Sequence, residues 1–252
     1  VDVTDKGYEV TAQAAVPAPA QGAGKASYTQ VTGSGATVAD AVDDINAKTG
    51  FYPKLAFCNL LVLGESCAQR QLFVVLDYFY RNGYVPLTAL VGMCRGSARE
   101  LLGKKPADGG MSASAIQRAM SEELKYSANS STVNLKLLAQ DGGSKSASCY
   151  MPYIEFSDGA SSSGGKEGNS GAGTGGKSGQ EGEGGAAQFT CLKTAAFSNG
   201  AFAGLLNEEG AFALNLIRCG VRYAIVNTVY GGKNYTVGLK NTGGGARMGV
   251  KG

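Results

Sequence analysis

The residue type most often used for acid–base catalysis is missing from this sequence. The chain contains no histidine, and histidine is the commonest general base and a frequent metal ligand. A Ser–His or Cys–His nucleophile pair is therefore impossible within the chain, as is any zinc site with a histidine ligand. Carboxylate, lysine or tyrosine chemistry stays open. We assign no catalytic, metal-binding or cofactor-binding residue and expect no enzyme, while any ligand-binding residues are unknown.

Glutamates are adjacent in two pairs, Glu122-Glu123 and Glu208-Glu209. Neighbouring residues on a helix point about 100° apart, so neither pair converges on one substrate atom. We interpret both pairs as solvated helix surface.

Arg95-Gly96-Ser97 comes just before a predicted helix. The first N–H groups of a helix can bind an anion. The commoner role of such a sequence is a capping serine beside a solvent-facing arginine.

The cysteines and tyrosines offer weaker signals. No two cysteines have the CxxC spacing of a redox motif or zinc ribbon. Cys58 and Cys94 lie in apolar runs and are interpreted as small buried hydrophobes, although an exported protein could form disulfides. Tyr78, Tyr80 and Tyr84 surround a predicted turn, where they pack at the rim of the core or anchor an interface.

Composition sets the broad class of protein. The chain has 252 residues, of which 43% are hydrophobic and 17% charged, with a net charge of +3. These values indicate a folded protein. No basic stripe is visible, so nucleic-acid binding is not expected. No stretch approaches the ~20 apolar residues of a membrane span.

The clearest compositional boundary is rich in glycine. Residues 159–185 include twelve glycines and no Val, Ile, Leu, Phe or Tyr. Such a segment buries too little apolar surface to offset its ordering entropy, which predicts a flexible linker between two folded parts. It lacks the GxxxxGK[ST] pattern of a phosphate-binding loop. We expect a first domain at 1–157, a linker at 158–187 and a small second domain at 188–252.

The first part alternates strand and helix patterns. Residues 8–13 form a predicted strand after a turn at residues 5–7, and Thr37 with Asp40 predicts the capped start of a helix that ends at Gly50. Apolar runs at 55–63 and 85–94 predict buried strands. Leu72, Val75, Leu76 and Phe79 repeat at helical spacing, as do residues 116, 119, 120 and 124. Ser97 with Glu100 predicts another cap.

The second part is short. Asn199-Gly200 between two apolar runs predicts a hairpin, residues 208–217 a helix, and residues 221–226 a half-buried strand. Together the patterns predict an α/β (α+β) fold: a mixed sheet with flanking helices in the first domain, and a hairpin plus helix in the second.

Several short segments are distinctive in their order along the chain. The sequence opens with DVTDKGYEVTAQ at 2–13, which leads to Pro17. It continues with GATVADA at 35–41, KLAFCNLLVLGE at 54–65, LDYFYR at 76–81, GSARELL at 96–102 and AAFSNGAFAGLL at 195–206. These segments and their order resemble those of the Ger(x)C spore germination proteins. The histidine usual at position 59 is replaced by Asn59.

The resemblance implies a lipoprotein, the C-type subunit of a germinant receptor on the outer face of the spore inner membrane. Its partners would be the A-type and B-type membrane subunits, and its lipid anchor would lie upstream of Val1. Such a subunit acts in the response to small germinants through protein–protein interaction, without chemistry or cofactor. The alternative is an extracytoplasmic solute-binding lipoprotein with two lobes around an amino acid or sugar.

Overall fold

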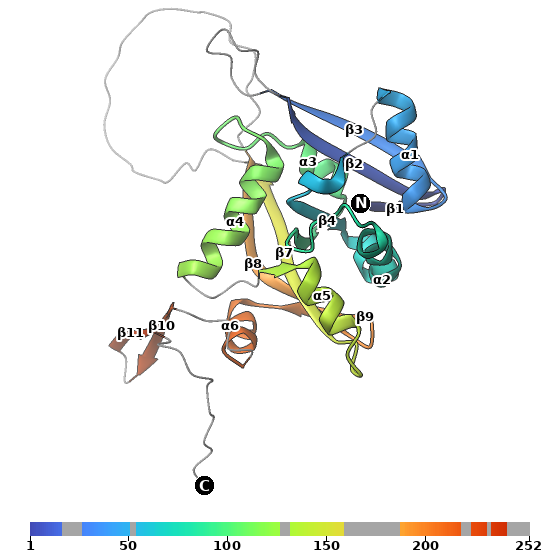
Figure 1. Cartoon of the computed structure of the whole chain (residues 1–252). Coiled ribbons are helices and arrows are strands. Elements are labelled where there is room, and N and C mark those ends of the chain that lie inside the picture. Colours follow the sequence, from blue (N-terminus) through green and yellow to red (C-terminus); the bar gives the residue numbers. More distant parts are fainter. Residues whose placement is uncertain are drawn as a thin grey trace, which may run out of the picture.

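The computed structural model describes residues 1–16, 27–50, 54–126, 132–158, 187–217, 223–230 and 233–240. They form a mixed α/β structure, which confirms the predicted fold class (Figure 1). The helices are α1 (Val38–Thr49), α2 (Glu65–Arg81), α3 (Ala98–Gly103), α4 (Ser112–Tyr126), α5 (Leu135–Gly142) and α6 (Glu208–Ile217). The strands are β1 (Asp2–Thr4), β2 (Gly7–Val16), β3 (Ser27–Gly35), β4 (Leu60–Gly64), β5 (Leu90–Cys94), β6 (Val133–Asn134), β7 (Cys149–Asp158), β8 (Ala187–Ser198), β9 (Ala201–Leu206), β10 (Tyr223–Tyr230) and β11 (Lys233–Lys240).

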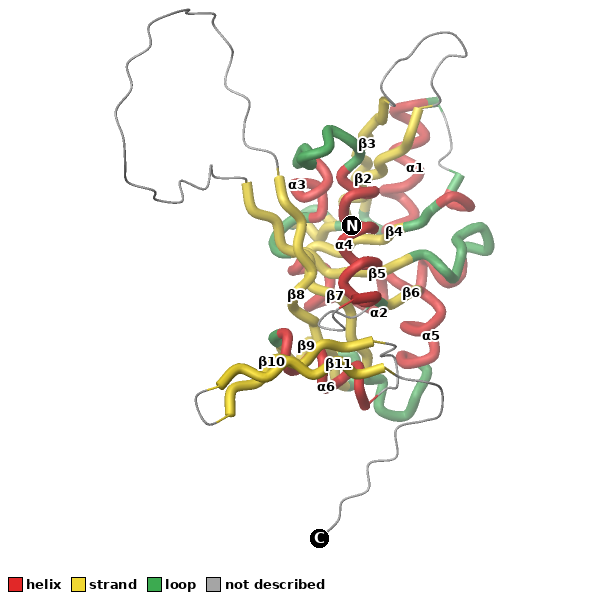
Figure 2. Tube along the Cα trace, turned by 90° about the vertical axis from the view of Figure 1, so that its left-hand side faces the viewer, coloured by secondary structure: helices red, strands yellow, loops and turns green. Residues whose placement is uncertain are grey.

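A mixed sheet runs through the middle of the molecule (Figure 2). Its strand order is β4-β5-β7-β8-β9, and β6 pairs with β5. The pairs β4–β5 and β5–β7 are parallel, whereas β7–β8 and β8–β9 are antiparallel. The parallel pair β4–β5 needs a crossover, which α2 provides.

Helices cover both faces of this sheet. Leu61 and Leu63 point to the face covered by α2 and α5, whereas Val62 points to the face covered by α3 and α4. This alternation follows from the period-2 geometry of a strand. A strand buried on both faces reads as a continuous apolar run, and the predicted buried strands are therefore confirmed in their C-terminal halves.

Both of these strands are shorter than predicted. β4 begins at Leu60, because residues 55–57 form a short 3₁₀ helix whose Phe57 side chain is 80% exposed. β5 begins at Leu90, after a turn that contains residues 83–84 and 87–88. Apolar residues in the preceding loops extended each apolar run beyond the sheet. A run of apolar residues does not by itself show where the loop ends and the strand begins.

A second sheet, of order β1-β2-β3, packs against α1. The predicted cap of α1 is confirmed: Thr37 Oγ1 accepts from the Asp40 N–H (3.1 Å), and Asp40 Oδ2 accepts from the Thr37 N–H (3.0 Å). Gly50 ends the helix with a positive φ of 70°. Val1 extends the second sheet alongside β4, because the Gly64 N–H donates to the Val1 carbonyl (2.8 Å).

The predicted hairpin at Asn199-Gly200 is confirmed as the β8–β9 turn, with positive φ at both residues (50° and 75°). Its N–H groups donate to the carbonyls of Ser146 (3.2 Å) and Ala147 (3.0 Å), which lie in the loop before β7. The predicted helix at residues 208–217 is confirmed as α6. The predicted strand that began at residue 221 is confirmed as β10, which pairs antiparallel with β11.

The hairpin of β8 and β9 is part of the mixed sheet that contains β4, β5 and β7. β8 pairs with β7 along most of its length, from Cys149↔Phe197 to Asp158↔Ala187. Residues 159–186 lie outside the described residues. The flexible linker predicted for this segment therefore stays a prediction. Because its two flanking residues are paired, this segment connects neighbouring strands of one sheet. Composition identified the segment, but strand partners far apart in sequence leave no local signal. The domain boundaries themselves stay a prediction.

Candidate functional site

The carboxyl edge of the parallel strands is the first place to look for a site, since ligands of α/β sheets bind there. β4 ends at Gly64, directly before α2, and β5 ends at Cys94, three residues before α3. β1 crosses this edge and brings the Asp2 side chain to the start of α3. The pocket beside these residues has a volume of about 470 Å³.

The N-terminus of α3 is occupied by a carboxylate of the chain itself. Asp2 is only 7% exposed. Its Oδ1 accepts from the Ala98 N–H (2.7 Å), and its Oδ2 accepts from the Arg99 N–H (2.9 Å) and the Ser97 hydroxyl (3.1 Å). The Ser97 Oγ also accepts from the Glu100 N–H (3.4 Å). The predicted capping serine is therefore confirmed, and the anion-binding geometry predicted as its alternative is satisfied internally.

Sequence analysis did not identify Asp2 as a capping residue. The only sequence signal for Asp2 was its place in the opening segment. Its contact with the Ala98 N–H joins residues that are 96 positions apart. Gly64 makes the contact possible, because a Cβ atom there would lie 2.0 Å from Asp2 Oδ1.

Other polar groups at this edge also bond to one another. Glu65 Oε2 accepts from the Gly96 N–H (3.1 Å), and the Glu65 N–H donates to the Gly96 carbonyl (2.8 Å). Glu9 forms an ion pair with Arg99 at 2.8 Å. Burial, with the nearby Glu65 carboxylate, raises the pKa of Tyr153 to about 12, so that its hydroxyl stays neutral. Hydrogen bonds at this edge therefore connect β1, α2 and α3.

Three of the described cysteines offer little nucleophilic character. Cys94 is fully buried, as predicted, and burial raises the pKa of its thiol to about 12. Burial likewise raises the pKa of Cys67 to about 11. Cys58 is half-buried, with its pKa raised by desolvation. A raised pKa lowers the thiolate fraction on which cysteine reactivity depends. Cys219 lies outside the described residues.

The acid pairs and the tyrosines fall in different environments. Glu208 and Glu209 are exposed at the start of α6, as predicted, while the side chains of the pair at 122–123 lie outside the described residues. Tyr78 and Tyr80 are half-buried and pack against the core, as predicted for rim residues, whereas Tyr84 is 77% exposed. The Tyr80 hydroxyl is buried without a hydrogen-bond partner in the described part of the chain, and burial raises its pKa.

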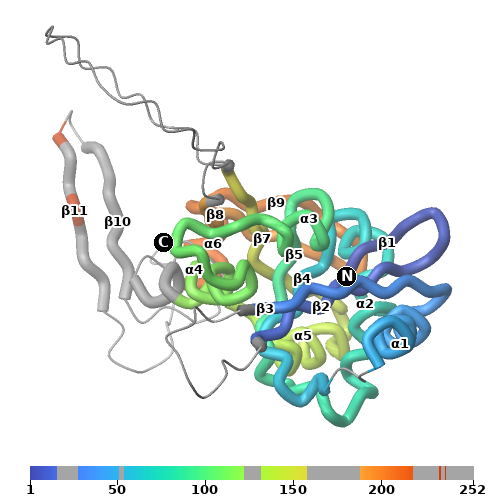
Figure 3. Tube along the Cα trace, turned by 90° about the horizontal axis from the view of Figure 1, so that it is seen from above, coloured from blue at the N-terminus to red at the C-terminus, as the bar shows by residue number. Residues whose placement is uncertain are grey.

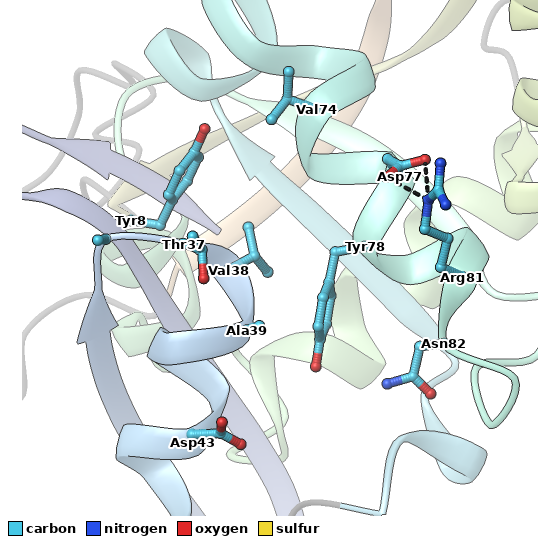
Figure 4. Close-up of a pocket in the computed structure, with 11 residues that line it drawn as sticks. Tyr8, Thr37, Val38, Ala39, Asp43, Val74, Asp77, Tyr78, Arg81 and Asn82 are labelled. Carbon is cyan, nitrogen blue, oxygen red and sulfur yellow. Dashed lines mark hydrogen bonds and ion pairs between the residues drawn. The ribbon is translucent and has the colours of Figure 1, made fainter.

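α1 and α2 lie next to each other (Figure 3). A larger groove, of about 640 Å³, is lined by residues of both helices. Figure 4 shows the Tyr78 side chain between α1 and the end of α2, with Val74 further along α2 and Asp43 on α1. On α2, Arg81 Nε donates to both carboxylate oxygens of Asp77 (2.8 and 2.7 Å). Sequence analysis did not predict this groove, since it arises from two helices that are separate in sequence.

The described residues contain no group of three or more Cys, Asp or Glu side chains placed to hold a metal ion. None of their helices has both the length and the apolar character needed to cross a membrane.

These features define a mixed α/β protein in which a carboxylate of the chain itself, that of Asp2, occupies the helix N-terminus at the carboxyl edge of the parallel strands. The model of the spore germination protein N-terminal domain matches residues 1–156, and the chain belongs to that family of spore germination proteins. The resemblance to the Ger(x)C proteins is thereby confirmed.

A solved structure similar to this chain is the crystal structure of the GerBC protein, at 16% sequence identity and a TM-score of 0.40. The match covers 92% of this chain and 58% of the GerBC chain, so the present chain spans little more than half of that protein's length. The comparison with curated proteins found no match.

Proposed function

We propose that this chain is part of a C-type germinant receptor subunit that works by protein–protein interaction at the membrane and catalyses no reaction. Its partners are the A-type and B-type membrane subunits. The lipid anchor lies upstream of Val1 and holds the protein on the outer face of the spore inner membrane. The observation that carries the proposal is the family match over residues 1–156.

The geometry of the carboxyl edge supports a role without chemistry. The carboxylates of Asp2, Glu65 and Glu9 all accept hydrogen bonds or pair with cations of the same chain. A general base or nucleophile needs access to a reacting atom. Side chains bonded in this way act instead to hold elements together.

Co-purification tests the proposed function. The full protein, tagged and expressed at native level, is extracted from spore membranes with mild detergent, and multi-span partners are identified by mass spectrometry. An unrelated spore lipoprotein with the same tag serves as the control. We expect the A-type and B-type subunits to be enriched with this protein alone. Repeated extraction without them would overturn the proposal.

The solute-binding alternative gains no support from the described residues. It requires two lobes joined by the glycine-rich segment, with the ligand between them. β8 and β9, which follow that segment, instead extend the sheet of β4, β5 and β7. Calorimetric titration of the chain with amino acids and sugars separates the two functions, since micromolar binding would favour the solute-binding protein.

A further inference from the structure

The groove between α1 and α2 has an apolar lining in an exposed position. Val38 and Ala39 from α1, and Val74 and Tyr78 from α2, contribute to it, and Tyr8 adds its ring from β2 (Figure 4). Val74 is 59% exposed. The groove is therefore open to solvent along α2.

Val74 is an exposed apolar residue of α2 that lines the groove. The six buried residues of this helix form one face, which points into the core. Val74 lies off that face, in a helix whose other exposed positions include Gln69, Arg70, Asp77 and Arg81. Valine is a poor helix former because its branched side chain loses freedom there. Neither core packing nor helix propensity explains this residue.

A carboxylate in the groove adds a second requirement for the segment that covers it, namely a positive charge. Of the acids on α1, Asp40 belongs to the helix cap and Asp44 pairs with Lys48 (2.7 Å). Asp43, in the groove, has no hydrogen bond or ion pair among the residues that the structure describes. Its carboxylate complements a cation, although the chain as a whole carries a net charge of +3. Arg81 is already paired with Asp77.

The walls of the groove determine the kind of segment that fits. Both are helices, whose backbone groups bond within the helix, so they offer no free sheet edge to an extended peptide. A small molecule would remain largely in water in so open a groove. A helix satisfies its own backbone and can pack its apolar side chains between those of α1 and α2.

We propose that this groove docks a helix of a partner protein, with an apolar face that covers Val74 and a lysine or arginine that pairs with Asp43. The inference rests on the proposed function, because it assigns a surface to the protein–protein contact. The groove then forms the partner-facing side of the first domain.

Site-specific photo-crosslinking tests the groove. A photoreactive amino acid replaces Val74 in the full tagged protein, or Leu137 in the control, which is 42% exposed on α5 outside the groove. Crosslinks are formed in intact spore membranes before any purification, and the linked peptides are sequenced. We expect position 74 to link to an apolar helical segment that contains Lys or Arg, with a markedly lower yield from position 137.

Reversing the charge of Asp43 tests whether it pairs with a lysine or arginine of the partner helix. Asp43→Lys should lower the crosslink yield from position 74 by about fivefold, whereas the exposed Asp5→Lys should leave it unchanged. Circular dichroism of each variant checks that the fold is intact. A crosslink to a second copy of this chain, a link to an acidic segment, no protein link, or no effect of Asp43→Lys would each overturn the proposal. If the protein co-purifies with its partners and position 74 still fails to link, the groove assignment falls while the proposed function stands.

Discussion

The contact between Asp2 and α3 gives the sharpest test of how this fold is held together. Replacing Asp2 by alanine removes a buried carboxylate that accepts two backbone N–H groups and one hydroxyl. The N–H groups of Ala98 and Arg99 then lose their partner at the start of a short helix. We expect β1 to loosen from the central sheet and the free energy of unfolding to fall.

The size of the effect follows from the contacts that are lost. Removing a capping side chain costs about 0.5–2 kcal/mol. A hydrogen bond to a charged group contributes about 1.5–3 kcal/mol, and donors left unsatisfied in a buried site add to the loss. Asp2 is 7% exposed, so water replaces it poorly. We expect a loss of about 2–3 kcal/mol for Asp2→Ala.

Urea unfolding followed by circular dichroism measures this loss, with the slope of the transition used to check that the same surface unfolds. Asp5→Asn is the matched control, because Asp5 is exposed in the β1–β2 turn and its replacement should change stability by less than about 0.5 kcal/mol. If Asp2→Ala is as stable as this control, the carboxylate does not hold β1 to α3 and the reasoning is wrong.

Two glycine substitutions and one labelling experiment test packing and burial. Gly33→Ala should lower the free energy of unfolding by about 3 kcal/mol in urea titrations, because its Cβ would lie 2.1 Å from a backbone oxygen of α1; Gly83→Ala, with open space around it, should not. Gly142→Ala places a Cβ 2.5 Å from the Phe73 ring, so a double-mutant cycle with Phe73→Leu should recover about 1 kcal/mol; an additive cycle would contradict the contact. Cys94 should resist iodoacetamide at pH 8.5 in the folded chain and react in urea, as read by peptide mass; rapid native labelling would refute its burial. Because the Cys94 pKa of about 12 exceeds the ordinary 9.0, the unfolded thiol ionises first, and its contribution to stability should decline as the pH rises above about 9.

Local signals predicted much of the fold. Thr37 and Asp40 form the predicted capping box, and Asn199-Gly200 forms the predicted turn, because each depends on residues close together in sequence. The buried face of α2 follows from its helical periodicity. The order of family motifs likewise indicated the spore germination family, which the domain match confirms.

β3 is a strand that the alternation of apolar and polar residues does not predict. Sequence analysis did not predict this strand, whose inner face carries Gly33 and Gly35 against α1. A Cβ at either glycine would lie less than 2.5 Å from α1, so the close approach of the helix requires their absence of side chains. Apart from Val31, this inner face carries only glycine and polar residues, so it gives too little hydrophobic alternation to predict a strand.

The candidate sites were less predictable than the elements. The sequence indicated an anion-binding geometry or a capped helix at Ser97, but only the tertiary structure brought Asp2 to it. The groove needed α1 and α2 to pack side by side before Val74 and Asp43 shared a surface.

The sequence alone thus determined the absence of histidine, the caps and turns, the helical and strand segments, and the family. Each depends on composition or on residues within a few positions of one another. Only the tertiary structure decided that β8 joins β7, that Asp2 caps α3, and that an apolar, acidic groove opens between two helices. Those contacts join residues tens of positions apart, and they form only once packing brings the separate elements together.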